Sequence, residues 1–234
     1  MKISFSINDR DFLIKPYNTF IEKELLLASS FEVEDLDQIL EILGFQELND
    51  VDLKELSEDE KKVLIYKYRE ISLGDEIEVK FTCDNCKQVN EGSLEAKDFL
   101  IPGKRNDPDI KKIGEPFDES SMPEYTGLSA GELDEMDIDE YEDLIQRVKD
   151  NQTSFNFVRE SKCLICGHVK SFDVSSSKYI IAIMSDDTLM TLYKTYNFMI
   201  YFGHYSKEDI DKMYPFERTI FVGLLNKTKE DLNQ

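Results

Sequence analysis

The chain has 234 residues and a mass of 27.3 kDa, and its 49 Asp and Glu residues outnumber 28 Lys and Arg residues to give a formal net charge of -21. With 41% hydrophobic residues, 10 Gly and 6 Pro, it is predicted to be globular rather than fibrous or low in complexity. The negative charge argues against non-specific binding to DNA, to RNA or to an anionic membrane.

The N-terminal segment is predicted to form a β-hairpin followed by helices. Residues 2–15 contain two short alternating runs around a turn at Asn8 and Asp9, which is the pattern of a hairpin. Apolar residues then recur with helical spacing in two segments, the first beginning at Thr19 and the second closed by Gly44. Ser57 and Glu60 form a capping box, which predicts that the helix over VLIYKYREISLG begins there.

Two later segments share a pattern of strand, C-x-x-C turn and strand. EIEVKFTCDNCKQVNEGSL carries Cys83 and Cys86, and FNFVRESKCLICGHVKSFDV carries Cys163 and Cys166. We interpret them as two β-hairpins, each with two thiols at its tip. Between them, residues 101–150 combine an open, proline-containing stretch with an acidic helix around IDEYEDLIQRVKD, and we interpret this region as an insertion.

The four cysteines predict a structural zinc site. Zinc prefers four soft donors at tetrahedral angles, and two C-x-x-C turns supply four thiolates with no cysteine left over. A redox dithiol is the alternative, but that motif begins a helix in a β-α-β unit and needs only one pair. A closed site of four cysteines leaves no position for water or substrate, so we expect the ion to stabilise the fold and not to catalyse.

Basic side chains near the turns have two interpretations. The basic side chains could bind nucleic acid, but we favour compensation of the negative charge of four thiolates around one Zn²⁺. These basic residues are Lys80, Lys87, Arg159, Lys162, Lys170 and Lys178.

His168 could be a further ligand, but with four thiols present it is expected to be a strand residue. His204 follows Gly203 at a predicted helix end, where capping is favoured over catalysis.

The C-terminal segment is predicted to be helical, with Ser206 as the N-cap of a short helix and Pro215 at the start of the last one. The helix that ends at Gly203 carries an unusually wide set of aromatic and methionine side chains. This set comprises Met190, Tyr193, Tyr196, Phe198, Met199, Tyr201 and Phe202. Core packing is the expectation, and an exposed patch for a partner protein is the alternative.

The acidic residues are concentrated in two windows. Residues 32–60 hold 12 acidic side chains and one basic one, and residues 115–143 hold 12 acidic and none. The run ELDEMDIDEYED lacks the spacing of a calcium loop, so we expect a solvated acidic face. There is no Gly-rich phosphate loop, GxSxG or HExxH motif, and we therefore predict no catalytic residues and no enzyme.

Several motifs resemble one viral family. They are "IKP" after the first hairpin, "REISLGDEIEV" leading into the first C-x-x-C turn, "CLICG" at the second turn and "YPFER" at the start of the last helix. Together, over roughly residues 10–100 and 153–228, they resemble the baseplate proteins of T-even-type contractile-tailed bacteriophages. The resemblance implies a protein of the central hub of the tail baseplate, either as a component or as an assembly factor. It also implies other baseplate or hub proteins as partners, with an oligomer in the assembly as one arrangement.

These observations predict an α+β fold, with helical N- and C-terminal regions around a Cys₄ zinc-ribbon-like pair of β-hairpins. The predicted domains are an N-terminal region (1–75), a zinc-ribbon module (76–100 plus 152–177), an acidic insertion (101–151) and a C-terminal helical region (178–234). A zinc ribbon that binds nucleic acid in transcription is the alternative function. The start MKISFSINDRDFLIKP lacks a signal-peptide pattern, so we expect the host cytoplasm during assembly, with the virion as a further location.

Overall fold

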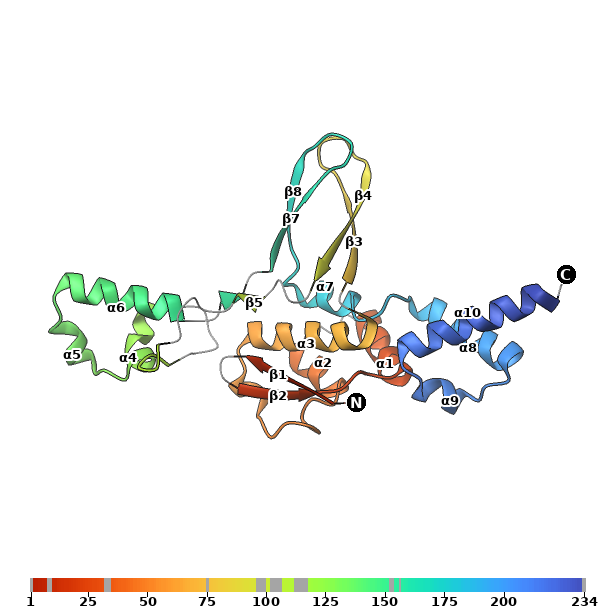
Figure 1. The fold of residues 1–234 in the computed structure, drawn as a ribbon, viewed down its shortest axis with the longest axis horizontal. Helices are drawn as coiled ribbons and strands as arrows, with labels where there is room; N and C mark the ends of the chain where they lie inside the picture. Colours follow the sequence, from red (N-terminus) through yellow and green to blue (C-terminus); the bar gives the residue numbers. More distant parts are fainter. Residues whose placement is uncertain are drawn as a thin grey trace.

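The computed structural model describes residues 2–7, 10–31, 35–74, 76–95, 100–101, 107–111, 118–151, 154–155 and 157–232. These residues form helices and small two-stranded antiparallel sheets, in agreement with the predicted α+β class. Figure 1 shows two long hairpins rising from a central body, with the helical insertion on one side and the C-terminal helices on the other.

The chain begins with the predicted hairpin, in which β1 (Ile3–Ile7) pairs with β2 (Arg10–Ile14). Alternation along the strands directs Phe12 and Ile14 into the core, where both are at most 1% exposed. The buried Asn49 side chain fastens the second strand: its oxygen accepts the Leu13 N–H at 2.7 Å and its nitrogen donates to the Leu13 carbonyl at 2.9 Å. The turn predicted at Asn8 and Asp9 lies outside the described residues.

Helices complete the central core around this hairpin. They are α1 (Thr19–Ser30), α2 (Leu36–Ile42), the short η1 (Leu53–Glu55), α3 (Glu58–Leu73) and α7 (Ser177–Ala182). The predicted capping box begins α3, because Ser57 Oγ accepts the Glu60 N–H and the Glu60 carboxylate accepts the Ser57 N–H. In α3, Leu64, Ile65 and Tyr66 are fully buried, so this helix is the centre of the core.

The two cysteine-bearing segments form the predicted hairpins. β3 (Glu76–Thr82) pairs with β4 (Val89–Glu95), and β7 (Val158–Lys162) pairs with β8 (Val169–Asp173). We call these four strands and their turns the arm. Val174 and Phe157 join its base to the core, where the Tyr66 hydroxyl donates to the Val174 carbonyl at 2.9 Å. A further sheet of two-residue strands, β5 (Leu100–Ile101) and β6 (Ser154–Phe155), is too short for a periodic pattern to predict.

The C-terminal helices have a smaller core of their own. They are α8 (Leu189–Gly203), α9 (Lys207–Lys212) and α10 (Pro215–Leu232), with the predicted Ser206 cap at the start of α9. Leu192, Met199 and Ile210 are fully buried at their centre. A buried ion pair between Arg218 of α10 and Glu22 of α1 connects these helices to the central body.

The structure corrects the prediction for the acidic insertion. In place of an open stretch before a single helix, the described part contains η3 (Glu119–Ser121), α4 (Met122–Thr126), α5 (Ala130–Asp134) and α6 (Ile138–Asn151). Met122, Tyr125, Leu144 and Val148 pack into a separate small core. The five-residue helices α4 and α5 are too short to show a helical period, and the abundance of carboxylates between their apolar residues favoured a solvated interpretation.

Candidate metal centre

The four cysteines lie in two turns of the same local geometry. In each turn the first cysteine donates its N–H to the carbonyl five residues later and accepts the N–H of the residue four positions later, at 2.8 to 3.0 Å. That later residue has a left-handed backbone, with φ of 61° at Lys87 and 73° at Gly167. The C-x-x-C spacing therefore folds into a tight loop with both sulfurs of each pair on one side.

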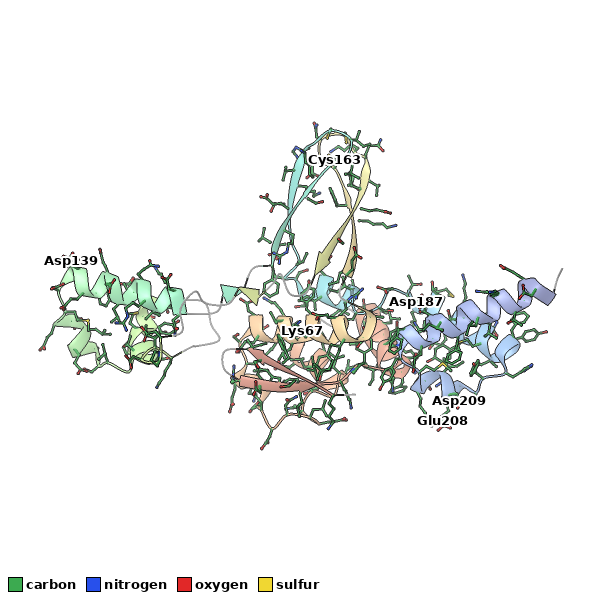
Figure 2. All side chains as sticks on the ribbon, viewed as in Figure 1. Lys67, Asp139, Cys163, Asp187, Glu208 and Asp209 are labelled. Atoms are coloured by element: carbon green, nitrogen blue, oxygen red, sulfur yellow. The ribbon has the colours of Figure 1, made fainter. Side chains whose placement is uncertain are left out.

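The two turns bring all four sulfurs together at the tip of the arm, where Figure 2 labels Cys163. All four Sγ atoms lie within 4.8 Å of one another, and the separations of Cys83 from Cys166 and of Cys86 from Cys163 are 3.6 Å and 3.5 Å. A tetrahedron with Zn–S bonds of about 2.3 Å has sulfur–sulfur edges of about 3.8 Å. A disulfide bond would need a sulfur–sulfur distance of about 2.05 Å. The cluster is therefore compatible with a metal site.

Polar contacts hold the two turns against each other. The Asn90 side chain, 4% exposed on β4, accepts the Leu164 N–H at 3.0 Å from the other hairpin. Lys170 of β8 donates to the Asp84 carboxylate at 3.0 Å and to the Thr82 carbonyl at 3.2 Å. These contacts fix the relative position of the two cysteine pairs.

Several of the basic residues near the turns bond to groups within the arm. Lys170 pairs with Asp84, Lys80 pairs with Glu91 at 3.0 Å, and Lys87 donates to the Asp84 carbonyl at 2.7 Å. Lys80 and Lys170 therefore face carboxylates of the arm, which makes them less available to phosphates; compensation of the thiolate charge stays a prediction. Lys178 is the one of the six whose side chain is outside the described part.

Backbone N–H groups favour the thiolate form at two of the sulfurs. Hydrogen bonds from the backbone of Cys166 and then of Ile165 lower the pKa of Cys163 to about 6, against the effect of burial. A hydrogen bond from the His168 backbone likewise lowers the pKa of Cys166. At Cys86, a backbone hydrogen bond lowers the pKa, but burial and the three neighbouring thiols raise it to about 12. A cation among the sulfurs would remove the mutual repulsion that makes this last deprotonation costly.

The two histidines lie outside the sulfur cluster. His168 is exposed immediately before β8, so it is not within the strand as predicted, and its carbonyl accepts the Cys163 N–H at 2.8 Å. His204 is the C-cap of α8 in a left-handed conformation with φ of 56°, and its backbone N–H donates to the Met199 carbonyl. Its capping role therefore comes from the backbone.

The aromatic and methionine set on α8 divides between core and surface. Tyr196 and Met199 are buried, as core packing requires, and Phe198 is half-buried. The remaining members are exposed by 45 to 71%: Met190, Tyr193, Tyr201 and Phe202. The sequence interpretation missed a second exposed row on α10, formed by Phe216, Ile220 and Leu224. Their spacing of four residues, beside the uncharged stretch 219–226, is the signal that could have revealed it.

The fold and the cluster define a class: a mixed α+β protein with a four-cysteine centre compatible with a metal, and with exposed apolar side chains on its C-terminal helices. The family described as T4 bacteriophage base plate protein matches residues 1–162. The C-terminal domain of the baseplate hub assembly protein Gp51 matches residues 183–230. The chain therefore belongs to the T4 bacteriophage base plate protein family, and the two matches support a structural role in assembly of the baseplate and its hub.

The two matched segments leave a gap between residues 162 and 183, and this gap contains Cys163 and Cys166. No curated protein and no solved structure matches the chain. Among the described helices, none has the length and apolar character needed to cross a membrane.

Proposed function

We propose that this chain is a structural or assembly protein of the central hub of a phage tail baseplate and acts by binding other baseplate or hub proteins. The observation that carries the proposal is the pair of family matches, which together cover most of the chain. The proposed setting is the host cytoplasm during assembly, with the finished virion as a further location. Nucleic acid and membranes are not expected partners, given the net charge of -21.

We further propose that Cys83, Cys86, Cys163 and Cys166 bind one structural Zn²⁺. The support is the separation of the sulfurs, which suits a tetrahedral thiolate shell. With four protein ligands the ion has no open position for water or substrate, so its role is to hold the two hairpins together and not to catalyse. This ion would connect segments far apart in the sequence and fix both ends of the acidic insertion.

The exposed apolar side chains of α8 and α10 are the proposed contact surfaces for partner proteins. Large apolar groups are costly to leave in water when several lie close together, and in soluble proteins such groups commonly mark interfaces. The two best sites for a test are Tyr201, 71% exposed, and Ile220, 59% exposed. Phe198 and Phe221 are less suitable, because Phe198 is half-buried and Phe221 is only 36% exposed.

Tyr201→Asp and Ile220→Asp are expected to leave the chain folded and to reduce complete baseplates by at least about tenfold, because a charge would be desolvated at the contact. The measurement is the yield of complete baseplates, by sedimentation and electron microscopy, when each variant is supplied to a phage that lacks this chain. Asn226→Asp, at an exposed polar position of α10, is the matched control and should assemble normally.

Normal yields of baseplates with both Asp variants would show that these side chains do not contact a partner protein. Normal yields with no copy of the chain present would contradict the assembly role itself. Melting temperatures within about 2 °C of the unchanged chain would establish that a loss of baseplates does not come from unfolding.

A further inference from the structure

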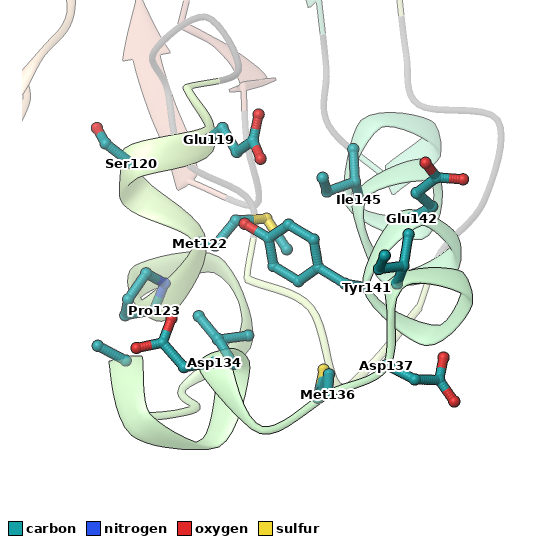
Figure 3. Close-up of a pocket in the computed structure, with 13 residues that line it drawn as sticks. Glu119, Ser120, Met122, Pro123, Asp134, Met136, Asp137, Tyr141, Glu142 and Ile145 are labelled. Atoms are coloured by element: carbon teal, nitrogen blue, oxygen red, sulfur yellow. The ribbon is translucent and has the colours of Figure 1, made fainter.

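The acidic insertion contains a groove that the assembly role described above does not use. It lies between η3 and α4 on one side and α6 on the other, with α5 closing one end, as Figure 3 shows. Its volume is about 680 Å³, within the range of about 300 to 1,000 Å³ that is usual for binding pockets. It is therefore large enough to receive several side chains of a ligand.

Apolar side chains form the floor of this groove. Met122 is 1% exposed, and Leu133, Met136, Tyr141 and Ile145 are partly buried against the small core of the insertion. Methionine side chains are flexible and polarizable, so they adapt to apolar groups of different shape. The floor thus offers a deformable apolar surface supported by a packed core.

The rim of the groove carries negative charge only. Four carboxylates line it, those of Glu119, Asp134, Asp137 and Glu142. Residues 118–146 contain 11 Asp and Glu and no Lys or Arg. In the part of the chain that the structure describes, no carboxylate of this segment forms an ion pair with a Lys or Arg side chain. The rim therefore has uncompensated charge around an apolar floor.

The dispersed positions of these carboxylates indicate which class of ligand the groove could bind. A divalent cation needs several oxygens converging on one point, but in the described residues the four cysteines are the only group of three or more candidate ligands that converges. Phosphate-bearing ligands are repelled by the rim. A segment with apolar groups on one face and several positive groups beside them matches both the floor and the dispersed rim.

We propose that this groove binds a positively charged amphipathic helix of a partner protein. Apolar side chains of the helix enter the groove over Met136, Tyr141 and Ile145, and its Lys or Arg side chains lie against the rim carboxylates. The inference rests on the proposed assembly function and deepens it, because it gives the chemistry of one partner. The groove is separate from the cysteine centre and from the apolar side chains of α8 and α10.

The test uses the full chain and a labelled synthetic helix of about 14 residues made of Leu and Lys, with leucines at helical i, i+3, i+4 and i+7 spacing. Fluorescence anisotropy at about 50 mM salt measures binding, so that screening does not hide the charge effect. A peptide of the same composition in strictly alternating order has no apolar helical face and is the ligand control. We expect saturable binding of the helical peptide and at least about fivefold weaker binding of the alternating one.

Two double variants distinguish binding in the groove from general electrostatic attraction of the peptide. Asp134→Asn with Glu142→Gln removes two rim charges, whereas Glu135→Gln with Asp143→Asn removes two charges at the adjacent positions, which do not line the groove. The rim variant is expected to weaken binding at least about fivefold and the adjacent variant less than twofold. Ile138→Ser, at a lining side chain that is 76% exposed, should also weaken binding without loss of helical content.

Three results would overturn the proposal: no binding of the helical peptide to the folded chain, equal effects of the two double variants, or equal binding of the two peptides. The peptide assay measures binding in the groove directly. The baseplate yield of a phage that lacks this chain tests the assembly role separately, so a failure of one is distinguishable from a failure of the other.

Discussion

A chain in which serine replaces Cys163 is expected to lose the proposed Zn²⁺ and the ordered arrangement of the arm. Each hairpin is only two-stranded, and such hairpins are marginally stable alone. Structural zinc contributes roughly 10 to 16 kcal/mol in small zinc-binding peptides, and that binding energy is folding energy where the site does not pre-exist. The loss should be confined largely to the arm, because the central core around α3 packs without any of the four cysteines.

Hydrogen exchange of residues 76–95 and 157–173, together with zinc content, measures this effect. Leu164→Ser is the matched control, because this side chain lies in the same turn and is 84% exposed. The control should retain zinc and exchange protection. Unchanged protection and zinc content in the Cys163→Ser chain would show that the four sulfurs do not form one metal site.

Replacing Arg218 with methionine is expected to destabilise the chain by about 3 to 5 kcal/mol, because it leaves the buried Glu22 carboxylate without its cation. Glu22 is 1% exposed and Arg218 is 4% exposed. Arg218 also donates to Asp187 at 2.9 Å and to Thr19 at 3.1 Å, so one guanidinium joins α10, α1 and the segment before α8. Burial disfavours the guanidinium charge, but the hydrogen bond and the charge of Glu22 raise the pKa of Arg218.

Urea unfolding of matched variants checks this estimate. Lys212→Met removes one partner of the exposed ion pair with Glu208 and should cost at most about 1 kcal/mol. A double variant with methionine at both Glu22 and Arg218 should recover much of the loss, because no buried charge remains unpaired. A single Arg218→Met variant as stable as the Lys212→Met control would contradict the contribution assigned to this ion pair.

The sequence predicted the elements whose signals are local. The alternating strands of the first hairpin, the capping box at Ser57 and the N-cap at Ser206 depend on neighbouring residues, and the structure confirms each of them. The C-x-x-C turns also have a local signature. Their convergence depends on two distant hairpins, but the count of four cysteines made it predictable.

Features that depend on distant contacts were not predictable in this way. Arg218 belongs to the "YPFER" motif, but nothing near it in the sequence indicates that its partner is Glu22. The groove of the insertion combines short helices whose apolar residues are separated by carboxylates. High charge density in the sequence suggested a solvated surface, whereas the structure brings the intervening apolar residues onto one side and packs them.

The most direct test of the proposed zinc site in the arm is the metal content of the full chain, purified without added metal. Inductively coupled plasma mass spectrometry measures the metal, and titration of the native chain measures the reactive thiols. We expect one zinc per chain and no thiol that reacts before the metal is removed. A metal-free chain with four reactive thiols and a fully protected arm would contradict this expectation.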